Sequence, residues 1–284
     1  MAVHQVESIV RSTSIEEAWE QRRREPHASR FLAGGVDLVL YAPPGVTTLI
    51  DLSGLGIDGV RRDGNDIVIG AMASLTNVLE SSLVAEVADG FLPRVLQRVA
   101  SPLQRNVATI GGAVVRAHPW SDVVPALLAL GARLDVFDGE RRTVDLAEAR
   151  GRSEEPFPLV LAVRIPAARK GMRAAFEKFS RTAFDVAMLN CACSTRMDRG
   201  VCRDVRIAIG GTPSVARRLP RAEEALAGKS LTPSVMASVA RAAAEEIDAR
   251  DDRRATAAYR RRLADIGVRR CLSALAEKKE PGSR

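Results

Sequence analysis

Two pairs of adjacent glycines constrain this chain more than any other feature of its sequence. Gly34-Gly35 and Gly111-Gly112 each follow a run that reads as a strand, "RFLA" and "NVATI". Glycine tolerates a positive φ and lets other atoms approach its backbone closely. Successive exposed N–H groups in such a turn can hold an anion. The two pairs therefore predict either two tight turns between strands or two loops that clasp one diphosphate.

The patterns around these pairs predict a mixed α and β fold. Residues 15–24 read as a helix with Ser14 as its N-cap, Glu17 placed for a capping box and arginines at its end. Further helices are expected in 75–87, 90–101 and 123–130, and several short ones after Arg221. Strands are expected in 46–53, 66–74 and 158–168, with hairpins at 132–146 and 187–213, the first around an Asp-Gly turn and the second around "DRG".

The stretch "PWSDVVPALLAL" follows the second glycine pair. Ser121 is expected to be the N-cap of its helix, and Pro125 falls in the first turn, where a missing N–H costs little. Asp122 then begins an otherwise apolar helix. Its carboxylate either complements the helix dipole or accepts a hydrogen bond from a ligand hydroxyl, and residue chemistry leaves both roles open.

A third glycine motif is a decoy. "GLGIDG", Gly54 to Gly59, matches the G-x-G-x-x-G dinucleotide pattern after a strand. A dinucleotide loop must open directly into a helix. Here the turn "VRRDGND" and the strand "IVIGA" follow instead, so the match is accidental.

Composition limits the class of protein. A chain of 284 residues, 46% of them apolar, is long enough for two or three compact units. No apolar run is long enough to span a membrane, and the N-terminus lacks a signal pattern, so we expect a cytoplasmic protein. The four cysteines have no metal-ligand spacing and are expected to be buried free thiols: Cys191, Cys193, Cys202 and Cys271.

The net charge of +7 comes from arginines that are mostly interleaved with Asp and Glu. Aromatic residues, which would stack on bases, are scarce in the last hundred residues, so a nucleic-acid partner is not expected. A surface that docks partner subunits is the better interpretation, with Arg260 to Arg262 as candidate docking residues.

Several segments together resemble a known family. "FLAGGVDLV", "IVIGAMASLTNVLES", "QRNVATIGGAVVRAHPWSDVVPALLALGARLDV", "FEKFSRTAFDVAML" and "DVRIAIGGTPSVARR" are similar, in order and spacing, to the FAD-binding medium subunit of molybdenum hydroxylases. This group contains carbon monoxide dehydrogenase and the flavin part of xanthine dehydrogenase. "RAEEALAGKSL" and "AYRRRLADIGVRRCLSAL" resemble its C-terminal domain, so the resemblance covers almost the whole chain.

The resemblance implies an α+β fold of the vanillyl-alcohol-oxidase/p-cresol-methylhydroxylase type. An FAD-binding domain is expected at 1–168, in subdomains of about 1–56 and 57–168, and a C-terminal domain of small antiparallel sheet and helical bundle at 169–284. No catalytic side chain and no metal ligand are implied in this chain. The residues implied to bind FAD are Ala33, Gly34, Gly35, Val36, Asp37, Leu38, Thr109, Ile110, Gly111, Gly112, Ala113, Asp122, Val160 and Lys178.

Lys178 can also be weighed on its own. It is one of five lysines among 37 arginines, and a compact ammonium near a flavin could stabilise negative charge on the reduced ring. The alternative is a surface lysine on a strand. The sequence departs from the family pattern at Val36, where Thr is frequent, and at Ala113, where Asn is frequent. Each departure removes a side-chain hydrogen bond worth roughly 1 kcal/mol.

The family's function implies electron flow from iron–sulfur clusters in a small [2Fe–2S] subunit, through FAD in this chain, to an external acceptor. Substrate would be hydroxylated in a large molybdopterin-binding subunit, so the substrate cannot be inferred from this chain. Two alternatives remain open: a free-standing FAD oxidoreductase of the same fold, and a basic binding or scaffold protein that keeps a degenerate flavin fold.

Overall fold

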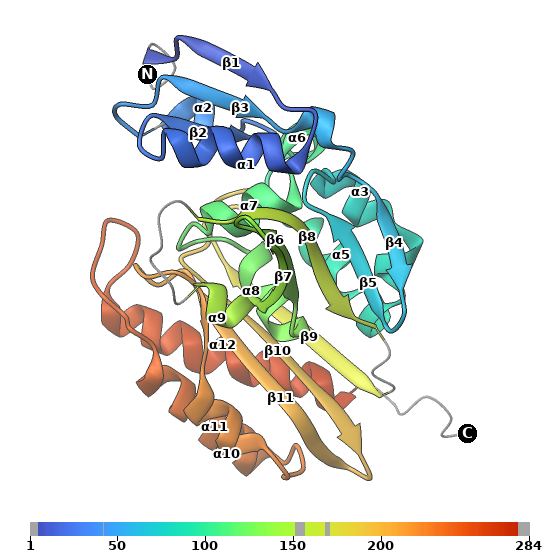
Figure 1. Ribbon diagram of the computed structural model, residues 1–284. Coiled ribbons are helices and arrows are strands. Elements are labelled where there is room, and N and C mark those ends of the chain that lie inside the picture. Colours follow the sequence, from blue (N-terminus) through green and yellow to red (C-terminus); the bar gives the residue numbers. More distant parts are fainter. Residues whose placement is uncertain (1–4, 42, 151–156, 168–170, 278–284) are drawn as a thin grey trace. The chain divides into compact units, whose positions relative to one another are not determined.

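The computed structural model describes residues 5–41, 43–150, 157–167 and 171–277 (Figure 1). The chain forms two compact units, each assembled from separate stretches. The first comprises Met1–Ser81, Ala100–Arg116 and Arg133–Arg164. The second comprises Ser82–Val99, Ala117–Ala132 and Ile165–Arg284. Each unit is described in turn.

The first unit contains two sheets. One is parallel, in the order β1-β3-β2, and the other is in the order β4-β5-β8-β6-β7. Their strands are β1 (Ser8–Arg11), β2 (Ser29–Leu32), β3 (Thr48–Asp51), β4 (Val60–Asp63), β5 (Asp66–Gly70), β6 (Arg133–Phe137), β7 (Arg141–Asp145) and β8 (Leu159–Pro166). The predicted strands in 46–53, 66–74 and 158–168 are confirmed, as is the hairpin around Asp138-Gly139.

Helices of the first unit are α1 (Ile15–Arg24), α2 (Leu38–Tyr41), α3 (Leu75–Glu80), α6 (Pro102–Val107), α7 (Ile110–Arg116) and α9 (Leu146–Arg150). Helix α1 begins where its cap predicts, because the Ser14 hydroxyl accepts a hydrogen bond from the Glu17 N–H (3.1 Å). Ala18 and Trp19 of this helix pack on Ile50 of β3 and on Leu159 of β8, in one apolar core.

Two local predictions in the first unit are wrong. The run "NVATI" is not a strand, because Ser101 and Pro102 start α6 with a full capping box and the helix extends to Val107. The predicted helix over 75–87 is divided at Ser81 into α3 and α4 (Ser82–Ala85). The motif "GLGIDG" leads through a short 3₁₀ helix, Ser53–Leu55, into β4 and β5, so its interpretation as a decoy is confirmed.

The second unit is built on one antiparallel sheet in the order β12-β11-β10-β9. Its strands are β9 (Met172–Phe179), β10 (Leu189–Asp198), β11 (Val201–Gly210) and β12 (Arg217–Arg218). Its helices are α4, α5 (Phe91–Leu96), α8 (Val123–Leu130), α10 (Pro220–Leu226), α11 (Pro233–Glu246) and α12 (Ala257–Glu277). The hairpin predicted around "DRG" is confirmed as β10 and β11.

Helices cover both faces of this sheet, and strand alternation in β10 separates the two faces. Cys191 points toward α12, with its Sγ 3.6 Å from that of Cys271. Ser194 points the other way and donates to the Ala129 carbonyl of α8 (2.5 Å). Figure 1 shows α10, α11 and α12 lying along one side of β10 and β11. All four cysteines are free and buried, as predicted.

Candidate functional site

The predicted site residues divide between the two compact units. Ala33 to Leu38, Thr109 to Ala113 and Val160 belong to the first, whereas Asp122 and Lys178 belong to the second. Each group is therefore treated as a candidate cluster within its own unit.

The first glycine pair forms a turn at the carboxyl end of β2. Gly35 has a φ of +68°, in the left-handed region that L side chains rarely adopt. Gly34 has no space for a side chain, because a Cβ there would overlap the carbonyl oxygen of Val107 at the end of α6. One glycine is required by conformation and the other by close packing of the turn on α6. The prediction of a turn here is confirmed.

This turn offers hydrogen-bond donors that the protein does not use. Within the described part of the chain, the backbone N–H groups of Gly34, Gly35 and Val36 donate to no protein acceptor. The turn also lies beyond the carboxyl end of a parallel strand, which is where ligands bind in open parallel sheets. Its free N–H groups and left-handed glycine suit an anion such as a diphosphate.

The second glycine pair is different from the predicted loop. Gly111 and Gly112 lie in the first turn of α7, and Gly111 packs against Ala71, where an added Cβ would be 2.7 Å from the Cβ of Ala71. The N–H groups of this turn are used inside the protein: Ile110 to Ala73 O (3.0 Å), Gly111 to Ala71 O (2.9 Å), Gly112 to Thr109 Oγ (3.1 Å) and Ala113 to Thr109 O (3.0 Å). The expectation of a second set of exposed donors is therefore wrong. This pair lets α7 approach the end of β5.

An ion pair not predicted from the sequence connects the two glycine segments. Arg116, in the last turn of α7, pairs with Asp37 of the first turn. Val160, the remaining candidate of this unit, lies in β8 opposite Val136 and is buried. The pairing of Arg116 with Asp37 fixes the first turn against the helix that carries the second glycine pair.

The candidate cluster of the second unit is a buried ion pair. The Lys178 ammonium lies 2.7 Å from Oδ2 of Asp122, and their side chains are only 3% and 6% exposed. Lys178 also donates to the carbonyl of Arg98 (3.0 Å). The alternative of a surface lysine is therefore wrong, although its place on a strand, β9, is as predicted. The Ser121 hydroxyl accepts from the Val124 N–H (3.3 Å), as a capping residue would, but the N-cap position of α8 is Asp122 and not the predicted Ser121.

Asn190 is a member of this cluster that sequence reasoning missed. Its Nδ2 donates to Oδ1 of Asp122 (2.6 Å) and to the carbonyl of Ser121 (3.0 Å). The one sequence feature that could have indicated Asn190 is that its polar amide interrupts the apolar run "MLNCAC" of a predicted strand. Lys178 and Asn190 face each other directly across β9 and β10, so the two strands hold one oxygen of Asp122 each.

The electrostatics of this cluster are those of a desolvated pair. Burial raises the pKa of Asp122, and the charge and hydrogen bond of Lys178, the amide of Asn190 and the charge of Arg98 oppose that rise. An ammonium has three donors, and two of those on Lys178 have partners among the described residues. The third N–H of this nearly fully buried ammonium has no protein acceptor among the residues that the structure describes.

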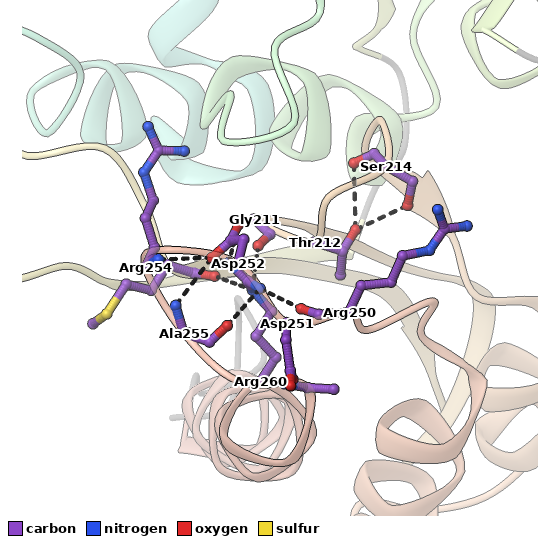
Figure 2. Close-up of polar contacts among 11 residues, drawn as sticks. Gly211, Thr212, Ser214, Arg250, Asp251, Asp252, Arg254, Ala255 and Arg260 are labelled. Atoms are coloured by element: carbon purple, nitrogen blue, oxygen red, sulfur yellow. Dashed lines mark hydrogen bonds and ion pairs between the residues drawn. The ribbon is translucent and has the colours of Figure 1, made fainter.

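Of the three predicted docking residues, one is buried and two are exposed to solvent. Arg260 is 1% exposed, and its guanidinium donates to carbonyls of Gly211 and Arg250 and to both oxygens of Asp252, as Figure 2 shows. Arg260 therefore cannot be a docking residue, because all its donors are used within the unit. Arg261 and Arg262 are exposed.

A stack of side chains lies beside this network. The Arg254 guanidinium lies 4.2 Å from the ring centroid of Trp120, and the Trp120 ring stacks on His118 at 4.6 Å between centroids. Gly211 donates its N–H to the Pro119 carbonyl (2.6 Å). The segment that leads to Asp122 is thus held by Arg254, from the loop between α11 and α12, and by Gly211, which follows β11.

Comparison with known protein families agrees with these features. Residues 4–168 match the model of the FAD binding domain in molybdopterin dehydrogenase, and residues 174–275 match that of the CO dehydrogenase flavoprotein C-terminal domain. The carbon monoxide dehydrogenase medium chain of Hydrogenophaga pseudoflava is 30% identical over 87% of this chain and 88% of its own. The 6-hydroxypseudooxynicotine dehydrogenase complex subunit alpha of Paenarthrobacter nicotinovorans is 28% identical over 89% and 88%.

Solved structures agree as well. One of carbon monoxide dehydrogenase from Hydrogenophaga pseudoflava aligns with a TM-score of 0.88 at 28% identity, covering 95% of this chain and 97% of the other. Quinoline 2-oxidoreductase from Pseudomonas putida aligns with a TM-score of 0.85 at 25% identity, covering 95% and 96%. The predicted α+β fold, the FAD cofactor and the family resemblance are confirmed. This chain belongs to the family of FAD-binding medium subunits of molybdenum hydroxylases and is an oxidoreductase component.

Proposed function

We propose that this chain is the electron-transfer subunit of a multisubunit molybdenum-dependent dehydrogenase. Its partners are a large molybdopterin-binding subunit and a small [2Fe–2S] subunit. When bound, FAD supplies the redox chemistry, accepting electrons from the iron–sulfur clusters and passing them to an external acceptor. The names of the relatives, "medium chain" and "complex subunit", support membership of such an assembly.

The observation that carries this proposal is the first glycine turn. The N–H groups of Gly34, Gly35 and Val36 are unpaired among the described residues and would hold the FAD diphosphate. Asp37, fixed by Arg116, keeps this turn in place. Because Val36 and Ala113 lack side-chain donors, binding relies on the backbone. Thr109 to Ala113 lead into and form the start of α7, the helix whose Arg116 pairs with Asp37 of the first glycine turn.

The cluster of Asp122 and Lys178 in the second unit would orient and tune a cofactor. Among the described residues, one N–H of Lys178 has no protein acceptor, and Asp122 is fixed in place by donors from two strands. The ion pair as a whole is neutral, so its effect on a flavin would come from the direction of the Lys178 donor more than from net charge. In the first unit, Val160 would supply an apolar wall. In this proposal no side chain of the chain acts as nucleophile or general acid.

Cellular placement and domain division belong to the same proposal. We place the assembly in the cytoplasm, and we divide the chain into an FAD-binding domain at 1–168 and a C-terminal domain at 169–284. None of the helices that the structure describes is long and apolar enough to cross a membrane.

Electron delivery can be tested directly. The chain is co-expressed with the proteins encoded beside it, and the purified material is examined for a [2Fe–2S] subunit and for FAD. The reduced [2Fe–2S] subunit is then mixed anaerobically with the FAD-loaded chain, and the flavin absorbance is followed. The proposal predicts co-purification and fast bleaching of the flavin. An FAD-loaded chain that binds no iron–sulfur partner and is reduced only by a small-molecule donor would instead indicate a free-standing oxidoreductase.

A further inference from the structure

We propose that Asn190 is a positioning residue that holds Asp122 ionised and fixed in orientation beside Lys178. The consequence for FAD rests on the proposed function, whereas the effect on Asp122 can be measured without any cofactor. The inference concerns the second unit alone, and all of its contacts lie within that unit.

The contacts of Asn190 lead to Asp122 from the opposite side to those of Lys178. Asn190 is completely buried in β10 and lies directly across from Lys178 in β9. Its two N–H groups donate to Oδ1 of Asp122 (2.6 Å) and to the Ser121 carbonyl (3.0 Å), whereas Lys178 takes Oδ2 (2.7 Å). Both carboxylate oxygens are therefore held, and the backbone before Asp122 is held by the same amide.

The other end of the amide shows why an asparagine stands here. Its Oδ1 is buried and has no hydrogen-bond partner among the described residues. A Cβ on Gly210 would be 2.6 Å from this oxygen, so the glycine of β11 provides the room in which the amide oxygen lies but no hydrogen-bond donor to it. A buried unpaired acceptor costs free energy that an apolar side chain would avoid. The amide is thus useful at this position only through its N–H groups.

The orientation of the amide is fixed by the same contacts. If the amide were turned over, its oxygen would face the Asp122 carboxylate and the Ser121 carbonyl, which are both acceptors. Nδ2 must therefore point at Asp122. A hydrogen bond to the charged form of a carboxyl group favours that form. This amide therefore opposes the rise in the pKa of Asp122 that burial causes.

The charged groups that face Asp122 are few. They are Lys178 on β9 and Arg98, which follows α5, and both favour the carboxylate. Loss of the Asn190 donor would leave a buried carboxylate with one donor fewer, so that Asp122 takes up a proton at a higher pH. Lys178 would then lose its ion-pair partner, and the orientation of its ammonium would no longer be fixed from that side.

The test uses the chain without cofactor and compares three variants. Asn190→Leu removes the donor at similar volume, and Asn190→Ala removes it with a smaller side chain; neither adds a titratable group. Ser194→Ala is the matched control, because Ser194 is buried on the same face of β10 and donates to a backbone carbonyl of α8, with no titratable partner. Urea unfolding is measured for each from pH 5 to pH 8.

The sign of the expected effect follows from linkage. An acid whose folded pKa is raised stabilises the fold below its unfolded pKa and loses that contribution as pH rises through the folded pKa. Both Asn190 variants should therefore lose stability relative to the parent as pH rises, by up to tenfold in the unfolding equilibrium constant per pH unit while Asp122 titrates. Ser194→Ala should show the same loss at every pH. A flat profile for both Asn190 variants, parallel to that of Ser194→Ala, would overturn the inference.

Two further outcomes are distinguished. If Asn190→Leu does not fold, Asn190→Ala carries the same comparison, because it also removes the donor without adding a titratable group. FAD binding is then titrated at pH 6 and pH 8. A pH-dependent unfolding profile with unchanged FAD binding would support the role of Asn190 toward Asp122 and remove this pair from the proposed flavin site.

Discussion

Replacement of Arg260 tests whether the loop between α11 and α12 depends on one buried cation. Arg260→Met replaces the apolar stem of the side chain with one of similar size but removes all five N–H donors. The carbonyls of Met188 and Gly211 then lose a donor, as do those of Arg250 and Ala255, and Asp252 loses both hydrogen bonds from the guanidinium (Figure 2).

The magnitude follows from the burial of the two partners. Removing one partner of a buried, hydrogen-bonded ion pair costs about 3–5 kcal/mol. Arg260 is 1% exposed but the Asp252 side chain is 35% exposed, so water can partly solvate the carboxylate that remains. We therefore expect the lower end, a loss of about 3 kcal/mol in the free energy of unfolding. Urea titration followed by far-ultraviolet circular dichroism measures this loss.

The neighbouring exposed residue supplies the control for this prediction. Arg261→Met changes the same residue type on the same helix turn, at a position exposed to solvent, and should change stability by less than about 0.5 kcal/mol. A loss below about 1 kcal/mol for Arg260→Met, or equal losses for the two variants, would refute the idea that the guanidinium fastens the loop. Loss of partner binding in Arg261→Met, with stability kept, would locate docking on the exposed arginines.

Three other perturbations have defined outcomes. Gly35→Ala forces an L residue into the left-handed region at a cost of about 1–2 kcal/mol. The turn that binds FAD then becomes less favourable, and isothermal titration should show FAD affinity falling roughly 5- to 30-fold. Gly64→Ala in the β4–β5 turn, also at positive φ, is the control and should leave FAD affinity unchanged. Lys178→Met leaves Asp122 buried without its cation and should lower stability by about 3–5 kcal/mol at pH 7; adding Asp122→Asn should restore most of it, and additive losses in the double variant would disprove the pairing. The contact with Cys271 and burial raise the pKa of Cys191, so a thiol reagent should modify none of the four buried cysteines in the native chain and all of them in urea; rapid native labelling of any one would contradict the burial.

The order of the elements could be predicted well because its signals are local. Ser14 caps α1 as expected, and the Asp-Gly and "DRG" turns join the strands that they were expected to join. The failure at "NVATI" has a physical cause. Four of its residues read as β-formers or neutral, but Ser101, Pro102 and Gln104 supply a strong helix start just before it. The capping box outweighs the β propensity of the residues that follow.

The two glycine pairs look alike in sequence but differ in structure. Among the described residues the N–H groups of Gly34 and Gly35 have no protein acceptor, whereas Gly111 donates to the Ala71 carbonyl and Gly112 to the Thr109 hydroxyl. For Gly111 the difference depends on an acceptor about forty residues earlier in the chain. No local pattern at "TIGG" contains that information, which is why one pair could be interpreted from its own residues and the other could not.

The buried cluster shows a similar limit. Lys178 and Asp122 could be singled out by residue type and by resemblance, but their contact depends on how α8 packs on the sheet. Asn190 could not be singled out in this way. It becomes visible only when the register of β9 and β10 places it across from Lys178.

The most direct test of the whole interpretation is the flavin content of the purified chain, expressed together with its partner subunits. The visible spectrum is recorded, the protein is precipitated with acid, and the released flavin is identified and counted per chain. The glycine turn predicts close to one FAD per chain, reduced strongly by Gly35→Ala and unaffected by Gly64→Ala. A colourless assembly that takes up no added FAD would contradict the assignment of this chain as a working flavin subunit.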